Sequence, residues 1–89
     1  MDFRWNDWNT EHLANHGVEP DEAEAVVRSA GPHYPLQRRG DDKWLVVGRG
    51  SGGRILQVVF AIDPDDQVYV IHARPLTDRE KRRWRRRQT

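Results

Sequence analysis

A histidine and an arginine near the end of an apolar segment are the side chains best placed for chemistry in this sequence. His72 and Arg74 follow the apolar run Val68–Ile71, and side chains two positions apart on a β-strand point to the same face. An imidazole titrates near neutral pH, so it can take up or release a proton. A guanidinium can bind a phosphate and stabilise the charge that develops on it during a reaction. Arg49 and Arg54 flank a glycine-rich loop and are further candidates for the phosphate contact.

These side chains are of the kinds required for cleavage of RNA without a metal ion or cofactor. The reaction requires a base near the 2′-hydroxyl, cations on the phosphate and a proton donor for the leaving oxygen. His72 can serve as the acid or the base, while Arg74 and either Arg49 or Arg54 hold the phosphate. Structural alternatives stay open, because His72 can bond to the backbone at a strand end and Arg74 can pair with Glu80 or another early carboxylate of the following helix.

The end of the sequence adds a dense cluster of positive charge. Five arginines surround Trp84 between positions 82 and 87. An arginine-rich helix with one aromatic side chain can follow a nucleic-acid backbone and stack on a base. In the alternative interpretation Trp84 packs on the sheet, and the arginines are solvated or bind an acidic partner. The residues expected to contact RNA are Arg79, Arg82, Arg83, Trp84 and Lys43.

The charges are distributed unevenly along the chain. Residues 1–42 contain four arginines and nine carboxylates, a net charge of −5, whereas residues 43–89 contain eleven Lys and Arg and five carboxylates, a net charge of +6. Such an asymmetry predicts a defined cationic surface. RNA is the polyanion that we expect to bind there.

Two further motifs do not predict a site. The segment Gly48–Gly53 resembles a phosphate-binding loop, but it lacks the Gly-Lys-Ser/Thr ending and no helix is expected after it. His12 and His16 are four residues apart on an expected helix, a spacing that can chelate zinc. Because no third ligand is evident in the sequence, we expect no metal site there.

The periodicity and the turn residues predict an α+β fold in a single domain, residues 1–89. Two N-terminal helices pack on a small antiparallel sheet of three to four strands, and a third helix ends the chain. Trp5 and Trp8 are expected to anchor the first helix on the core. The first half is expected to form a strand at Phe3–Trp5, a helix at Trp8–His16 capped by Asn6 or Asp7, and a helix that starts at Glu19–Glu22 and ends before Gly31. The second half is expected to form strands at Trp44–Gly48, Ile55–Ile62 and Gln67–Ala73, followed by a last helix capped by Thr77. An extra short strand around Tyr34–Leu36 is an open alternative.

The composition limits the class of protein. A chain of 89 residues without cysteine can form neither a disulfide framework nor a zinc–thiolate site. No run of eighteen apolar residues and no basic-then-apolar pattern at the N-terminus occurs. We therefore expect a soluble, cytoplasmic protein.

Several segments, taken in order, resemble the BrnT-type toxin family. In the first half they are Phe3–Asn6, Asn9–Val18 and Pro20–Glu24, and in the second half they are Gly48–Arg49, Gly53–Leu56, Val58–Phe60 and Ile71–Arg74, followed by Thr77, Arg79, Glu80 and Trp84. The resemblance covers nearly the whole chain apart from residues 30–43.

This resemblance implies a small RelE-like fold and a ribonuclease that needs no metal or cofactor and inhibits translation as the toxin of a type II toxin–antitoxin pair. It also implies a cognate ribbon-helix-helix antitoxin, similar to BrnA, that binds the toxin and with it represses their shared promoter. DNA would then be contacted only through that complex. Arg74 and either Arg49 or Arg54 are the implied phosphate contacts, with Glu80 and Trp84 beside them on the last helix.

The sequence departs from the family's pattern at three positions. His72 stands where Ser or Thr is usual and adds an imidazole, Trp84 stands where Tyr is usual and lacks its hydroxyl, and Asn6 stands where Asp is expected. Two other functions therefore stay open. One is a non-catalytic module of the same fold that binds RNA or protein through its arginines, and the other is a structural partner of an acidic protein.

Overall fold

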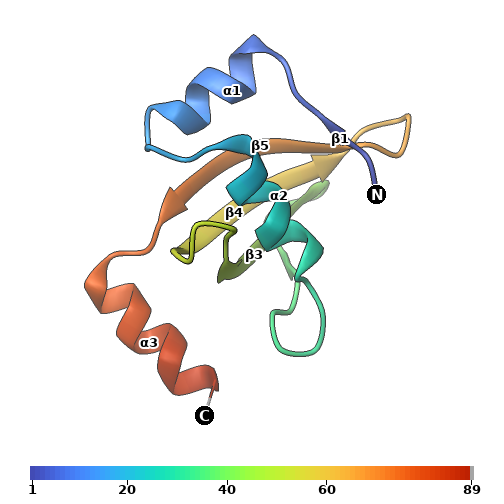
Figure 1. Cartoon of the computed structure of the whole chain (residues 1–89). Coiled ribbons are helices and arrows are strands. Elements are labelled where there is room, and N and C mark those ends of the chain that lie inside the picture. The colour runs from blue at the N-terminus through green and yellow to red at the C-terminus, as the bar shows by residue number, and fades with distance from the viewer. Residues whose placement is uncertain (89) are drawn as a thin grey trace.

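The computed structural model of the chain describes residues 1–88, in which five strands form one sheet accompanied by three helices (Figure 1). In chain order the elements are β1 (Phe3–Arg4), α1 (Asp7–Ala14), α2 (Pro20–Arg28), β2 (Gln37–Arg38), β3 (Lys43–Arg49), β4 (Ile55–Ile62), β5 (Val68–Pro75) and α3 (Asp78–Gln88). The order of strands across the sheet is β1-β5-β4-β3-β2. α2 crosses one face of the sheet, α1 lies beside β5, and α3 lies beyond the end of β5 (Figure 1).

The three long strands pair as the sequence predicts. β3 pairs with β4 and β4 with β5, in both cases antiparallel. The two connecting turns use the expected residues: Gly53 has a φ of +88°, and Asp63 Oδ1 accepts hydrogen bonds from the backbone N–H groups of Asp65 and Gln67. Loops this short can only join antiparallel neighbours.

The edges of the sheet differ from the prediction. Strands of two residues extend it on both sides, so that it has five strands rather than three to four. β1 runs parallel to β5, with Phe3 opposite Val68, so the expectation of an antiparallel sheet is wrong at this edge. β2 forms at Gln37–Arg38 instead of around Tyr34–Leu36 and, like the extra strand left open in the sequence, it precedes β3. The strand at Phe3–Arg4 was expected, but a strand of two residues is too short for its sequence pattern to select a partner or a direction of pairing.

Two asparagines fix the start of α1. Asn6 is the N-cap: its Oδ1 accepts from the N–H of Asn9 at 3.2 Å, and Asn9 Oδ1 accepts from the N–H of Asn6 at 2.8 Å. Asn9 is fully buried, and its Nδ2 donates to the carbonyls of Arg4 and Val70, both at 3.1 Å. A buried amide with these partners ties α1 to the edge of β5. Gly17, with a φ of +69°, follows the helix as expected.

The core lies between the sheet and the helices α1 and α2. Asn9 and Leu13 form the inward stripe of α1. Trp8 lies beside this stripe and is 54% exposed, so the prediction that it anchors α1 in the core is wrong. Trp5 does pack against the core, and its Nε1 donates to Glu24 Oε2 at 2.7 Å. The buried cluster consists of Leu13, Val18, Ala23, Val26, Val27, Val46, Leu56, Val58, Phe60, Val68, Val70 and Ala73.

α3 is almost entirely polar. Thr77 and Glu80 form the predicted capping box, in which Thr77 Oγ1 accepts from the N–H of Glu80 at 3.2 Å and Glu80 Oε1 accepts from the N–H of Thr77 at 2.9 Å. Within residues 1–88 none of the helices has the length and apolar character needed to cross a membrane.

Candidate functional site

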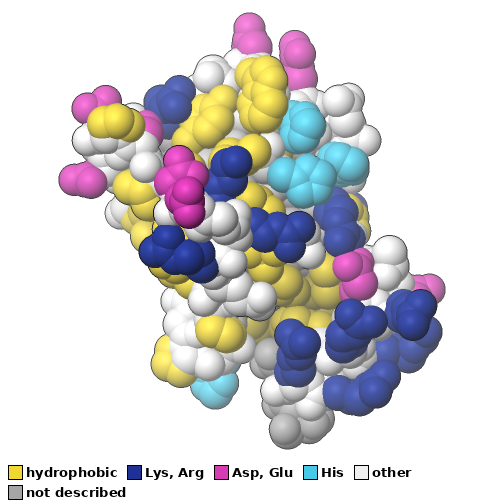
Figure 2. Space-filling view, turned by 180° about the vertical axis from the view of Figure 1, so that it is seen from behind, with side chains coloured by type: hydrophobic (Ala, Val, Ile, Leu, Met, Phe, Trp, Pro, Cys, Tyr) yellow, Lys and Arg dark blue, Asp and Glu magenta, His cyan; other side chains and the backbone are white. Residues whose placement is uncertain are grey.

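The predicted catalytic pair lies on the face of the sheet turned away from α2, which we call the outer face. Arg74 is opposite Gln57 on β4, and His72 is opposite Val59. Since residues 57 and 59 are two apart on β4, the side chains of His72 and Arg74 share this face, as predicted. Figure 2 shows the outer face, with histidine side chains gathered toward α1 and Lys and Arg side chains concentrated on α3.

Arg74 is fixed by a two-point ion pair with Glu80. Its Nη1 donates to Glu80 Oε1 at 2.7 Å and its Nη2 to Glu80 Oε2 at 2.8 Å. Nη2 also reaches Gln57 Oε1 at 3.4 Å, and Nη1 donates to the carbonyl of Pro75 at 3.2 Å. The alternative of an Arg74–Glu80 pair is therefore realised. The Arg74 side chain remains 29% exposed, so it stays accessible to an anion on the outer face.

The titration of the pair follows from these bonds. The hydrogen bonds from Arg74 and, next, from the backbone N–H of Thr77 lower the pKa of Glu80 to about 2. The same carboxylate raises the pKa of Arg74. Both groups are therefore charged at every physiological pH.

His72 belongs to a cluster of three histidines. Its ring centroid lies 4.9 Å from that of His16 and 5.6 Å from that of His12, and the rings of His12 and His16 are 6.2 Å apart. Burial lowers the pKa of His72, and the nearby charges of His16, His12, Arg74 and Arg39 lower it further. The neutral imidazole, which can accept a proton, is therefore favoured near neutral pH.

The two histidines of α1 were not expected near His72. They reach it because α1 packs along the edge of β5 and because β5 has an irregularity at Ile71, where Val59 pairs with His72 but Phe60 pairs with Val70. The i, i+4 spacing of His12 and His16 was the only signal in the sequence, and it lacked the third member. Within residues 1–88 no group of three His, Asp or Glu side chains is arranged to hold a metal ion.

Arg54 lies on the opposite face of the sheet from His72 and Arg74, where it contacts α2. Its Nε and Nη2 donate to the carboxylate of Glu22 at 3.2 and 2.9 Å, and Nη2 also donates to the carbonyl of Gly17 at 2.7 Å. The hydrogen bond from Arg54 is the main reason why the pKa of Glu22 is lowered. These bonds join the start of β4 to the start of α2, a structural contact.

Arg49 lies at the end of β3 and donates from Nη1 to the carbonyl of Gly53 at 2.8 Å. Together with Arg54, Lys81 and Arg85 it lines a hollow of about 280 Å³ near the end of the sheet. The structure thus brings Arg49 and Arg54 together with two cations of α3. It places neither of them beside His72.

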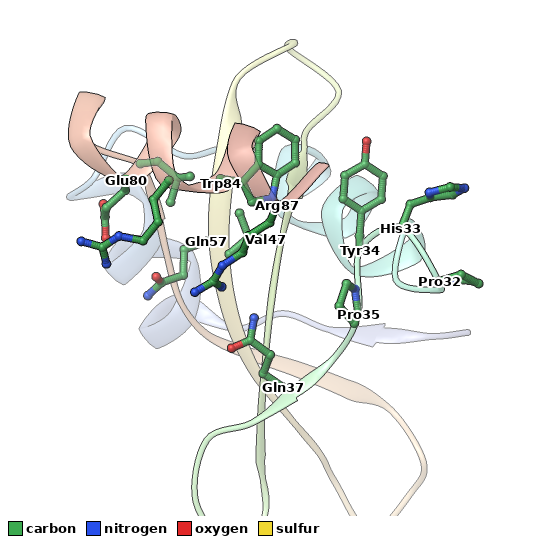
Figure 3. A pocket seen from close by; sticks show the side chains of 12 residues that line it. Pro32, His33, Tyr34, Pro35, Gln37, Val47, Gln57, Glu80, Trp84 and Arg87 are labelled. Atoms are coloured by element: carbon green, nitrogen blue, oxygen red, sulfur yellow. The ribbon is translucent and has the colours of Figure 1, made fainter. Parts of the chain in front are cut away.

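A larger cavity, of about 310 Å³, opens between α3 and the outer face (Figure 3). The segment 32–37, which the sequence did not explain, forms one wall, and Trp84 and Arg87 come from α3 on the opposite side. The ring of Trp84 is stacked with that of Tyr34, with centroids 5.9 Å apart and planes inclined by 9°. The other lining residues include Gln37, Val47, Gln57, Glu80 and Arg83.

The residues expected to contact RNA occupy several positions. Arg83 and Trp84 line this cavity, while Arg79 and Arg82 are exposed elsewhere on α3. Lys43 is opposite Ala61 at the far end of the outer face, away from α3. The structure therefore gathers some of these side chains around one cavity and leaves the others apart.

Comparison with known proteins identifies a similar fold. No protein-family model matches the sequence, and no curated protein matches it. Among solved structures, the 1.1 Å crystal structure of the Brucella abortus ribonuclease toxin BrnT superimposes with a TM-score of 0.67 and 18% sequence identity, over 88% of this chain and 99% of that chain. At this identity the likeness is one of fold. The chain thus has the fold of a BrnT-type toxin.

Proposed function

We propose that this protein is the toxin of a type II toxin–antitoxin pair and that it cleaves RNA without a metal ion. The observation that carries the proposal is the placement of a fixed guanidinium, Arg74, and a largely neutral imidazole, His72, on one face of the sheet. The likeness in fold to a ribonuclease toxin supports it.

In the proposed reaction His72 accepts the proton of the RNA 2′-hydroxyl. The 2′-oxygen attacks the adjacent phosphorus, and the bond from phosphorus to the 5′-oxygen breaks as the 5′-oxygen takes up a proton from solvent water. His72 then releases the proton that it accepted to the solvent, which restores the neutral imidazole. The products are a 2′,3′-cyclic phosphate and a 5′-hydroxyl. Arg74 binds the non-bridging oxygens, whose negative charge grows in the transition state.

Glu80 positions Arg74 in this scheme. Its carboxylate is itself held by the backbone N–H of Thr77 at the start of α3, so the guanidinium is oriented before RNA binds. A guanidinium carries five N–H donors in a planar fork. Arg74 can therefore keep a contact with Glu80 while it donates to a phosphate.

Arg49 and the cations of α3 supply the remaining affinity for RNA. Arg49, Lys81 and Arg85 place three positive side chains around one hollow, which suits the phosphates of the strand that flank the cleaved bond, while Arg54 at the same hollow stays bonded to Glu22. We further propose that a ribbon-helix-helix antitoxin neutralises the toxin by covering this cationic surface, and that DNA is reached only through the complex.

The decisive experiment is cleavage of a defined single-stranded RNA by the purified chain in the presence of EDTA. We expect the wild type to produce a 2′,3′-cyclic phosphate and a 5′-hydroxyl. Arg74→Ala, at equal folded concentration, should produce neither. Expression of both variants from a tight promoter adds growth and RNA integrity as cellular readouts. A folded Arg74→Ala variant that cleaves RNA and arrests growth like the wild type would remove Arg74 from the site.

One observation favours a second function. The guanidinium of Arg74 is already bound by a carboxylate at two points, as in a structural ion pair. A non-catalytic module that binds RNA through its arginines would have this arrangement, and it predicts salt-sensitive binding without cleavage and no effect of His72→Ala.

A further inference from the structure

We infer that the cavity between α3 and the segment 32–37 binds one unpaired nucleobase of the RNA strand, next to the phosphate held at Arg74, and so sets the base preference of the protein. This inference rests on the proposed function, because it takes RNA as the substrate. Apart from Glu80, it concerns residues that the catalytic scheme does not use. One wall of the cavity comes from residues 32–37, which the family resemblance in the sequence does not cover.

The size and the aromatic wall of the cavity suit a base. A volume of about 310 Å³ lies at the lower end of the roughly 300–1,000 Å³ of small-ligand cavities, enough for one nucleotide. The near-parallel rings of Tyr34 and Trp84 present flat aromatic surface at its border (Figure 3). Bases of any kind stack on such rings, since every base has a π-face.

Two glutamines give the cavity the means to distinguish bases. The side chains of Gln37 and Gln57 line it on either side of the apolar side chain of Val47 (Figure 3). Each carboxamide offers two N–H donors and an acceptor oxygen, and the exposed edges of unpaired bases carry donors and acceptors that proteins read in this way. The Gln37 carboxamide makes no hydrogen bond to any of the described residues, so it is available to a ligand.

The same residues connect the cavity to the proposed reaction centre. Gln57 Oε1 lies 3.4 Å from Arg74 Nη2, and Glu80, which also lines the cavity, holds Arg74 directly. A base seated beside Gln57 therefore belongs to a nucleotide adjoining the phosphate at Arg74. This continuity is the reason why the occupant is a base of the strand that is cut.

The charge around the cavity agrees with an RNA strand. Arg83 and Arg87, one turn apart on α3, line it, whereas Arg82 on the same helix does not. Arginines at the rim can bind the phosphates on either side of a seated base. An acidic peptide would use the arginines but would leave the aromatic rings and the two carboxamides without a role.

The test measures binding to oligonucleotides that cannot be cut. Fluorescently labelled 2′-O-methyl pentanucleotides, one for each of the four bases, are titrated with the wild type and with four single variants. These variants are Trp84→Ala, Gln37→Ala, Arg83→Ala and, as the matched control for Arg83→Ala, Arg82→Ala. We expect an affinity loss of about tenfold or more for Trp84→Ala, as for other stacking residues. Gln37→Ala should narrow the difference between the best and worst base, and Arg83→Ala should weaken binding more than Arg82→Ala, which removes the same charge from the same helix.

Several outcomes would overturn the inference. Equal losses of affinity for Arg83→Ala and Arg82→Ala, together with an unchanged difference between the best and the worst base for Gln37→Ala, would show that binding depends on net charge alone. Gln37 is exposed, so this variant keeps the test valid even if Trp84→Ala impairs folding. Nucleoside 5′-monophosphates that bind as tightly as the pentanucleotides would assign the cavity to free nucleotides instead of RNA.

The inference and the proposed function can fail separately. If the wild type binds the pentanucleotides in a Trp84-dependent way but never cleaves RNA, the catalytic proposal is wrong and the base-binding cavity stands. If the wild type cleaves RNA while the cavity variants bind like it and keep its base preference, the cavity proposal is wrong and the catalytic one stands.

Discussion

Two glutamates of this protein have the same position in two helices, and each binds an arginine from the sheet. Glu22 and Glu80 are both the third residue of their helix, and both accept a hydrogen bond from the backbone N–H of the residue that caps it. Glu22 binds Arg54 at the start of β4, and Glu80 binds Arg74 at the end of β5. The chemistry of the two pairs is almost identical.

The surroundings of the two pairs differ. Glu22 is buried, with 10% of its side chain exposed, and the remaining bond of Arg54 goes to the carbonyl of Gly17 in the loop before α2. The Arg74–Glu80 pair has about equal exposure on both partners, 29% and 33%, and it lies between His72 and the cavity beside α3. The first pair joins elements of the core, and the second fixes a cation on the outer face.

The kind of contact that an arginine makes therefore does not identify it as functional. An arginine whose neighbours are a helix start and backbone carbonyls stabilises the fold. An arginine whose neighbours are an imidazole, a carboxamide and a cavity is available to a substrate. Four substitutions test whether the two pairs divide their roles in this way.

The largest effect is expected for Arg74→Ala. Removing the guanidinium takes away the stabilisation of the transition-state phosphate, and we expect the rate of RNA cleavage to fall about 10³-fold, as when a catalytic anion-stabilising donor is lost. Cleavage assays at equal folded concentration measure this loss. Arg54→Ala is the matched control and should keep the wild-type rate per folded molecule. Equal losses of cleavage rate in the two variants would contradict the proposal that Arg74 is functional and Arg54 is structural.

His72→Ala should reduce the cleavage rate about 100-fold, at the lower end of what general base catalysis contributes. Because the pKa of His72 is lowered from its usual value of 6.5, the proton-accepting form prevails at neutral pH. The wild-type kcat/KM should therefore rise with pH in the acidic range, with the midpoint of the rise below pH 6.5. A pH–rate profile of His72→Ala that keeps this rise would assign the base to another group.

Arg54→Ala should act on stability. The substitution leaves the buried carboxylate of Glu22 without its partner, and we expect the free energy of unfolding to decrease by about 1–2 kcal/mol after allowance for the partial exposure of Arg54. Urea denaturation followed by circular dichroism measures the change. Arg74→Ala, whose carboxylate partner can be rehydrated, should lose less, and the reverse order would mean that the outer pair is the structural one.

The smallest effect concerns the acid stability of the Arg74–Glu80 pair. The folded-state pKa of Glu80 is about 2, below its usual 4.5, so the contribution of the pair is complete above about pH 4.5 and is lost as the pH falls toward 2. Because Glu80 is one-third exposed, the contribution should stay below about 1 kcal/mol. Glu80→Gln should reduce the slope of stability against pH in this range, and an unchanged slope would show that the pair adds nothing measurable.

Much of this fold and part of its candidate site can be predicted because the signals are local. Asn6, Pro20 and Thr77 begin the three helices as expected, and the glycine and Asx turns dictate antiparallel β3, β4 and β5. Strand periodicity alone places His72 and Arg74 on one face. Each of these features depends on residues within a few positions of one another, so the sequence determines it.

Other features depend on which distant segments meet. Three contacts join parts of the chain that have no sequence pattern in common. They are the parallel pairing of β1 with β5, the approach of His12 and His16 to His72, and the stacking of Trp84 on Tyr34. The same holds for the surroundings of Arg54 and Arg74, which the sequence offered as phosphate contacts without showing what lies beside them. Tertiary structure alone decided that Arg54 faces a buried carboxylate while Arg74 faces a cavity, because burial and charge around a side chain are set by the elements that pack beside it.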